Sequence, residues 1–384
     1  MTEQPYRTTI VKLGRPARDH LEAAIRSAVP SVAPALALSV WQSGSPWFCA
    51  YAGWTDPEHR DTPVTSRTLF DLASLTKLFT ATALLRLASD GRVGLDDPVV
   101  SVIPEFGAGG PRGVDGGQEP LSRRMLPVPP ERAAWTVDPA VVTFRQLLTH
   151  TGGLAPWRSV FRDGGLAAIY GYPFVARPGT EVHYSDLGFM LLGEAVARLF
   201  RAPLEVAMQA LVRDRLGLDS LTYAPSRTGR PQRDIAPTSI DEDWRGRRCW
   251  GEVDDENAAS LDGVAGHAGL FATADDVARF GVAWLRRDPR LRLPAYWTTA
   301  TSDQTPGMGG ARGLGWQVAP ADYLAPFGAG AYGHTGFTGT SLAIDPRRDL
   351  VVALLTDRGY ADRTHEGIEE LRLGVHTLIA EVFE

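Results

Sequence analysis

A serine and a lysine three residues apart stand at the head of a strongly apolar run. Ser74 and Lys77 stand at the head of the run Leu78–Ala88, whose composition predicts a buried helix. Side chains three residues apart share a helix face, so Lys77 Nζ can reach Ser74 Oγ. A serine hydroxyl becomes a strong nucleophile when a neighbouring base takes its proton. A buried lysine can be that base, because burial destabilises its ammonium.

Lysine is used selectively in this chain. There are 39 Lys plus Arg residues, and only Lys12 and Lys77 are lysine. Arginine could not serve as the base, because it stays charged. Ser74 would also lie at the positive end of the helix dipole, which favours developing negative charge. The alternative is an ordinary buried helix whose lysine extends toward solvent, and the pair alone leaves both interpretations open.

Length and composition describe an ordinary globular protein. The 384 residues suffice for one large or two moderate domains, and a net charge of −6 gives no reason to expect nucleic acid or an anionic membrane as partner. Two cysteines form no disulfide framework, and the eight histidines form no metal-binding pair, so no metal or other cofactor is expected. The N-terminus does not resemble a signal peptide and no apolar run reaches roughly 18 residues, which predicts a cytoplasmic protein.

Strand patterns lie near both ends of the chain and helix patterns lie mainly between them. Alternating apolar residues predict strands at 35–42, 47–54, 314–319, 341–344 and 350–356. Helical spacing predicts further helices at 16–29, 144–148, 187–200, 203–216, 274–286 and 368–382. The stretches 106–139, rich in glycine and proline, and 227–251, polar and rich in arginine, are predicted as surface loops.

This order of elements predicts an α+β fold. Residues 1–95 and 290–384 would build one antiparallel sheet from both termini, flanked by helices. Residues 96–289 would form an inserted, mainly helical domain that carries the Gly/Pro-rich loop at 106–140. Ser74 would then lie where the two domains meet, a usual place for a binding site.

Two later motifs extend the pair into a constellation. Tyr-Ser-Asp at 184–186 precedes a predicted helix, and His-Thr-Gly at 334–336 enters a predicted strand. A tyrosine in a turn can share the proton of Ser74, and a strand edge can offer an N–H group to an oxyanion. Ser-x-x-Lys, Tyr-Ser-Asp and His-Thr-Gly in this order resemble the serine beta-lactamase and penicillin-binding protein superfamily. The tyrosine motif is most similar to its class C beta-lactamase-like branch, which includes family VIII carboxylesterases and D-aminopeptidases.

The resemblance covers residues 36–357 and includes stretches at 147–154, 263–271 and 333–346. It implies a beta-lactamase/transpeptidase-like fold and acyl transfer, with Ser74 as nucleophile and Lys77 as its base. Tyr184 would assist acylation and protonate the leaving group. The backbone N–H groups of Ser74 and Phe337 would form the oxyanion hole, and His334 would flank the acyl group.

Two further residues complete the predicted site. Gly336, in the same motif as His334, would help to form the oxyanion and substrate-binding strand. Trp157 could line the substrate pocket or simply pack in the core.

Two positions depart from the pattern of the superfamily. His334 stands where true beta-lactamases commonly have lysine, and it is mostly neutral at pH 7. We therefore expect weak beta-lactam binding and a preference for a neutral ester or amide. Asp186 stands where asparagine is common. It would either raise the pKa of Lys77 and shift the proton transfer to Tyr184, or cap the following helix.

The leading hypothesis is a serine hydrolase that forms an acyl-enzyme and cleaves small carboxylic esters. A D-aminopeptidase or amidase, or a weak beta-lactamase, would use the same chemistry. The third hypothesis is a non-catalytic ligand-binding protein on the same fold. The expected partner is a small ester or amide, and the sequence leaves the oligomeric state open.

Overall fold

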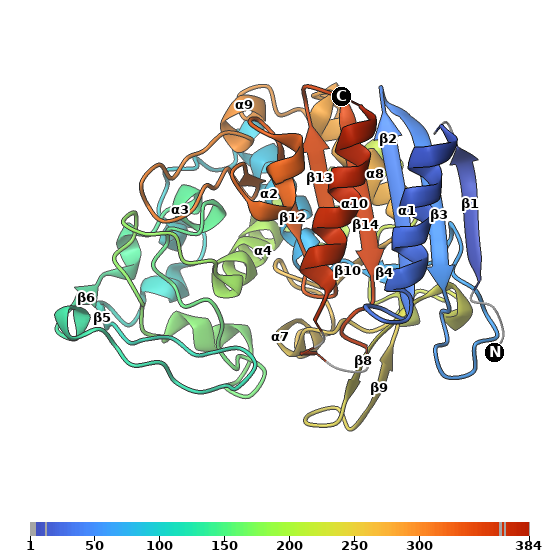
Figure 1. Cartoon of the computed structure of the whole chain (residues 1–384). Helices are drawn as coiled ribbons and strands as arrows, with labels where there is room; N and C mark the ends of the chain where they lie inside the picture. The colour runs from blue at the N-terminus through green and yellow to red at the C-terminus, as the bar shows by residue number, and fades with distance from the viewer. Residues whose placement is uncertain (1–4, 12–13, 361–362, 365, 384) are drawn as a thin grey trace.

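Strands from the two ends of the chain pair at the centre of one large sheet. The computed structural model describes residues 5–11, 14–360, 363–364 and 366–383. A seven-stranded antiparallel sheet has the strand order β1-β3-β2-β14-β13-β12-β11, and a mostly helical region lies beside it (Figure 1). The central pair joins β2 (Ala35–Gln42) to β14 (Leu350–Thr356). The predicted α+β class, with a sheet built from both termini, is confirmed.

The other strands of this sheet are β1 (Tyr6–Val11), β3 (Ser45–Gly53), β11 (Gln317–Val318), β12 (Tyr332–Thr335) and β13 (Ser341–Asp345). Smaller sheets contain β4 (Phe70–Asp71), β7 (Thr222–Tyr223) and β10 (Leu270–Ala272), then β5 (Arg112–Gly113) with β6 (Thr136–Val137), and β8 (Pro237–Asp241) with β9 (Arg247–Trp250). The α-helices are α1 (Arg15–Ala28), α2 (Thr76–Ser89), α3 (Phe144–Leu148), α4 (Asp186–Phe200), α5 (Leu204–Met208), α6 (Asp214–Leu216), α7 (Glu256–Ala259), α8 (Ala274–Leu285), α9 (Trp297–Ala300) and α10 (Ile368–Val382).

Both faces of the large sheet are covered by helices. Leu36 and Leu38 of β2 belong to an apolar cluster shared with α1 and α10, which lie side by side over the sheet in Figure 1. The alternate residues Ala35 and Ala37 belong to the core shared with α8. Helix α8 approaches so closely that a Cβ atom on Gly281 would lie 2.6 Å from Val351 Cγ1 of β14, so glycine permits this contact.

Helix α8 lies within the segment that we assigned to the inserted domain, yet it packs on the sheet. The proposed division into a sheet domain and an inserted domain, with boundaries at residues 95 and 290, stays a prediction. None of the helices in the described part of the chain is long and apolar enough to cross a membrane.

Three local predictions were wrong. The segment 227–251, predicted as a loop, contains the hairpin β8–β9, whose turn is held by an ion pair of 2.6 Å between Arg245 Nε and Asp241 Oδ2. The predicted helix 203–216 is interrupted by a π-helical turn at Gln209–Arg213. The His-Thr-Gly motif ends β12 rather than entering a strand. In each case short-range pattern was overruled by side-chain pairing or packing that the pattern does not encode.

Ser74 lies in a 3₁₀ turn (Ala73–Leu75) that leads from β4 into α2. Helix α2 is buried on all sides, from Thr76 to Ala88, as its uninterrupted apolar composition predicts. The turn is therefore fixed between a buried strand and a buried helix.

Candidate active site

Ser74 Oγ is the point where two other predicted residues meet. Lys77 Nζ lies 2.8 Å from Ser74 Oγ, and Tyr184 OH lies 2.7 Å from it. Lys77 lies in the first turn of α2, and Tyr184 lies two residues before the first residue of α4. A hydroxyl that contacts both an amine and a phenol can pass its proton to either group.

Lys77 is completely buried and paired with a carboxylate. Its Nζ lies 2.7 Å from Asp186 Oδ1 and donates a hydrogen bond of 3.1 Å to the carbonyl of His267. Burial by itself lowers the pKa of Lys77, but the Asp186 carboxylate and Tyr184 raise it, and the net direction is upward. Lys77 is therefore held as an ammonium at neutral pH in the resting protein.

The turn before α4 leaves Asp186 available for this ion pair. Ser185, not Asp186, caps α4, because its Oγ accepts the N–H of Gly188 at 3.2 Å. The N–H of Ser185 donates to His150 Nδ1 at 3.0 Å, and the His150 ring lies 4.6 Å from that of Tyr184. Burial lowers the pKa of His150 well below its usual value, so a neutral imidazole fixes the tyrosine turn.

A buried carboxylate holds the backbone around the nucleophile. Asp71 Oδ1 accepts the N–H of Ala73 at 2.9 Å, and Asp71 Oδ2 accepts the N–H of Asp254 at 2.7 Å. Ala73 has φ +46°, a left-handed conformation that costs about 1–2 kcal/mol for a residue with a Cβ. Burial raises the pKa of Asp71 to about 7. The strained turn that presents Ser74 thus depends on a side chain that is itself costly to ionise.

The turn after β12 packs directly on the nucleophile turn. A Cβ on Gly336 would lie 2.8 Å from the carbonyl oxygen of Leu72, so only glycine permits the approach. Thr338 Oγ1 donates to the carbonyl of Asp71 at 2.8 Å. On the other side, Arg372 Nη2 of α10 donates to the carbonyls of Gly336 at 2.7 Å and Thr340 at 3.0 Å. The backbone on both sides of Phe337 is therefore fixed, while its role in an oxyanion hole stays a prediction.

His334 is buried and its tautomer is defined by one contact. Nδ1 lies 2.7 Å from the carbonyl of Thr335, so Nδ1 carries a hydrogen and donates it. Burial, Lys77 and Arg312 lower the pKa of His334 well below its usual value. The imidazole is neutral, and its Nε2 therefore presents an acceptor lone pair rather than a positive charge.

These residues surround a cleft of about 550 Å³. The cleft is lined by residues from both halves of the molecule: Ala73, Ser74, Glu119, Pro120, Leu121, Pro156, Trp157, Tyr184, Asp186, Asp254, Asp255, Glu256, His267, Ala268, Arg312, Gln317, His334, Thr335, Gly336, Phe337, Arg358, Arg363, Ile368, Glu369 and Arg372. The structure thus brings all the predicted site residues together, with Lys77 buried beneath Ser74.

Sequence reasoning missed Arg312, a cation on the cleft wall. Its Cζ lies 5.4 Å from the centre of the Tyr184 ring, and its Nη1 has no hydrogen-bond partner among the described residues. Burial lowers the pKa of Arg312. No motif marks this residue, because it stands in a glycine-rich loop before β11 and meets Tyr184 only in the folded chain.

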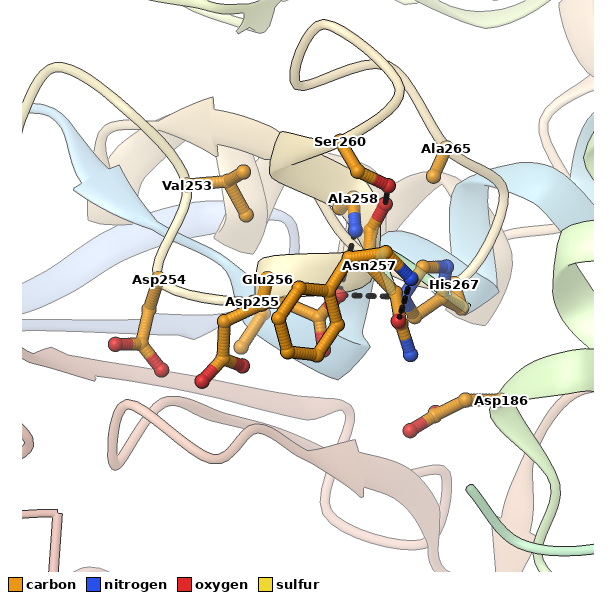
Figure 2. A network of polar contacts seen from close by, with 12 residues as sticks. Asp186, Val253, Asp254, Asp255, Glu256, Asn257, Ala258, Ser260, Ala265 and His267 are labelled. Carbon is orange, nitrogen blue, oxygen red and sulfur yellow. Dashed lines mark hydrogen bonds and ion pairs between the residues drawn. The ribbon is translucent and has the colours of Figure 1, made fainter. Parts of the chain in front are cut away.

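An acidic loop forms another part of the wall, and its charges are largely paired. His267 Nε2 lies 2.8 Å from Asp255 Oδ1 (Figure 2). Arg363 contacts Asp254 Oδ2 at 3.3 Å and Glu256 Oε1 at 2.5 Å. Asp254 and Glu256 are buried beside the cleft, and Asp255 is partly buried there.

One group of possible metal ligands lies away from the cleft. Asp56, Glu58 and His59 bring three ligand atoms together. Arg248 contacts both acids, at 3.1 Å from Asp56 Oδ1 and 3.4 Å from Glu58 Oε2. A guanidinium already contacts both acids, so we assign no metal to this group.

Comparisons with known proteins identify the family of the chain. A family model described as Beta-lactamase matches residues 21–376. A protein of Escherichia coli (strain K12) named "Putative D-alanyl-D-alanine carboxypeptidase" is 30% identical over 336 residues, 77% of this chain and 70% of that protein. The N-acetylmuramyl-L-alanine amidase of Bacillus subtilis (strain 168) is 30% identical over 335 residues, 78% of this chain and 70% of that protein.

Among solved structures, that of EstCE1, a hydrolase with promiscuous acyltransferase activity, superposes with a TM-score of 0.70. It covers 94% of this chain and 98% of its own at 20% identity. This likeness concerns the fold alone, and with the family match it confirms the predicted beta-lactamase/transpeptidase-like architecture.

Proposed function

The chain belongs to the beta-lactamase family, a family of serine hydrolases, and from that premise we propose that it cleaves small carboxylic esters through an acyl-enzyme on Ser74. The supporting observation is the position of Ser74 Oγ, within hydrogen-bond distance of both Lys77 Nζ and Tyr184 OH. A serine held between two such groups has the proton path that nucleophilic attack needs.

The reaction proceeds in two steps. Ser74 Oγ attacks the acyl carbon while its proton passes to the Lys77–Tyr184 pair, and Tyr184 then protonates the departing alcohol. Water attacks the acyl-enzyme, gives a proton back through the same pair to Ser74, and releases the acid. The reactive form is the one in which Lys77 and Tyr184 together have lost one proton. Asp186 opposes this loss, because it raises the pKa of Lys77.

A second candidate function, cleavage of a peptide bond next to a free carboxylate, is favoured by Arg312. Arg312 lines the cleft, and a guanidinium there can donate a charge-assisted hydrogen bond to a carboxylate. The two relatives of 30% identity carry the names of a carboxypeptidase and an amidase. The acyl-enzyme would be the same, and only the leaving group would differ.

Labelling of the nucleophile tests the proposal. After treatment with a fluorophosphonate, mass spectrometry should find one adduct, on the peptide that contains Ser74. Ser74→Ala should lower kcat for p-nitrophenyl acetate at least about 10³-fold, whereas Ser101→Ala, at an exposed serine outside the cleft, should leave it unchanged. An adduct on Ser341 would contradict the assignment. Absence of both adduct and turnover would favour the non-catalytic binding protein.

A further inference from the structure

We propose that residues 117–126, called the cleft hairpin below, form an apolar subsite that binds a bulky apolar group of the substrate through Leu121. This deepens the proposed function, on which it rests, by naming a substrate class for the same cleft. The hairpin lies within the Gly/Pro-rich segment 106–140, to which the sequence assigned no role. Pro120 and Leu121 from its tip line the cleft beside Pro156 and Trp157.

Backbone hydrogen bonds hold the tip of the hairpin in a defined conformation. Gln118 bridges to Met125, and the N–H of Leu126 donates to the carbonyl of Gly117 at 2.9 Å. The N–H of Glu119 donates to the carbonyl of Arg124 at 3.0 Å. These contacts make a short antiparallel hairpin, so Leu121 is presented at a defined position.

The base of the hairpin is fastened to the segment that carries Trp157. Arg158 Nη2 lies 2.5 Å from Asp115 Oδ1, with the guanidinium almost fully buried. The N–H of Ser159 donates to Gln118 Oε1 at 3.2 Å. Both contacts lie next to Trp157 in the chain, so they hold the hairpin against the Trp157 segment, and Leu121 and Trp157 both line the cleft.

Charges near this wall are already satisfied within the protein. Glu119 uses its carboxylate to accept two N–H groups of the tip, from Leu121 at 3.1 Å and from Ser122. Glu256 Oε1 lies 3.3 Å from Arg123 Nη2, and Arg363 also contacts it. A ligand that reaches this wall therefore meets carbon atoms and paired charges, which favours an uncharged, apolar group.

About half of the Leu121 surface is nevertheless left exposed to solvent. It is 52% exposed, and Met125 and Leu126 of the same hairpin are 49% and 38% exposed. In the described part of the chain, the other large apolar side chains that are this exposed lie on other segments. A leucine that borders a catalytic cleft and is half exposed can bury its apolar surface against a substrate, which contributes favourable free energy in proportion to the area covered.

A series of p-nitrophenyl esters from acetate to octanoate tests the subsite with the full chain. The wild type should give a higher kcat/KM for octanoate than for acetate. Leu121→Asn should reduce the octanoate-to-acetate ratio of kcat/KM roughly 10-fold, the effect of losing most of one leucine contact. Leu373→Asn changes a similarly exposed leucine, 44% exposed on α10 and outside the cleft, and should leave the ratio unchanged. Leu121→Phe should preserve or raise it.

Each other outcome has a defined meaning. An unchanged ratio in Leu121→Asn overturns the subsite while leaving the proposed hydrolase intact. Binding of the wild type to phosphatidylcholine vesicles that Leu121→Asn abolishes would assign the hairpin to a lipid surface instead. A concentration-dependent shift in gel-filtration elution that the variant removes would assign it to a second copy of the chain. If no ester is cleaved, the proposed function fails. The subsite can then still be tested by calorimetry of octanoate binding. Equal affinity of wild type and Leu121→Asn for octanoate would overturn the subsite.

Discussion

Lys77 Nζ and Asp186 Oδ1 lie 2.7 Å apart beneath Ser74, and the lysine is completely buried. A carboxylate at this distance stabilises the ammonium and so opposes the proton loss that activates Ser74. The resting protein therefore holds Lys77, the proposed general base, in the charged form, and Tyr184 is the second group in hydrogen-bond contact with Ser74.

Removing this carboxylate should move the pH dependence. Asp186→Asn keeps the shape of the side chain and removes its charge, so the pKa of Lys77 should fall. The ascending limb of kcat/KM against pH should move down by about one pH unit, the size expected from one nearby charge. Asp19→Asn, at an exposed carboxylate on α1, should not move it. An unmoved limb in Asp186→Asn would mean that Asp186 has only a packing role.

Tyr184→Phe should slow the step in which the leaving group receives its proton. The phenyl ring keeps its contacts with His150 and Arg312, but the proton donor is lost. We expect kcat to fall roughly 10²- to 10⁴-fold for an alkyl ester. The loss should be smaller for a p-nitrophenyl ester, because p-nitrophenolate leaves without a proton. Parallel steady-state kinetics on the two esters measure the difference. Equal losses would show that the tyrosine acts only in the attack by Ser74.

Arg312→Gln should separate neutral from anionic substrates. A peptide that ends in D-alanyl-D-alanine with a free carboxylate would contact the guanidinium, whereas its carboxamide would not. A charge-assisted hydrogen bond contributes roughly 1.5–3 kcal/mol, so the variant should lower kcat/KM for the free peptide roughly 10- to 100-fold. Activity on p-nitrophenyl acetate serves as the internal control and should change little. If the wild type does not distinguish the two peptides, the carboxypeptidase candidate is excluded.

Asp71 should affect the pH dependence of the free energy of unfolding. Burial raises its pKa from 3.8 to about 7, so between these values the folded protein holds a proton that the unfolded chain releases. This contribution to stability is fully present below pH 3.8 and is lost as the pH rises through about 7.

Asp71→Asn should remove that dependence. Between about pH 5 and 6.5, the free energy of unfolding should fall less steeply than in the wild type, by up to about 1.4 kcal/mol per pH unit. Denaturant titrations at several pH values measure both slopes, with Asp19→Asn as the matched control. Parallel curves for Asp71→Asn and wild type would show that Asp71 titrates alike in both states.

The sequence predicted the parts of this protein that are encoded over short distances. Ser74 and Lys77 meet because they are three residues apart at the start of a helix. Strands β2 and β14 were predicted at their observed bounds, because their apolar runs end at clear turn residues. The edge strand β1 was not predicted, since its residues acquire a partner only by pairing with β3.

The residues that hold the site in place were not predictable in this way. Asp71, Arg312 and Arg372 act on groups far from them in sequence, and single charged residues produce no periodic pattern. The role of Asp186 could be stated from the sequence only as a choice between a helix cap and an ion pair. The structure separates the two, because Ser185 provides the cap and Asp186 lies beside Lys77.

The contact of Arg372 with the turn after β12 also has a consequence for biosynthesis. A ribosome makes Ser74 early, but the carbonyls of Gly336 and Thr340 gain their guanidinium partner only after residue 372 has been added. The central strand β2 likewise waits for β14 before its second edge is paired. A nascent chain that stops before α10 therefore carries Ser74 without the contacts that Arg372 and β14 supply. If Ser74 is the nucleophile that we propose, competence for acylation should arise only after α10 has been made and docks.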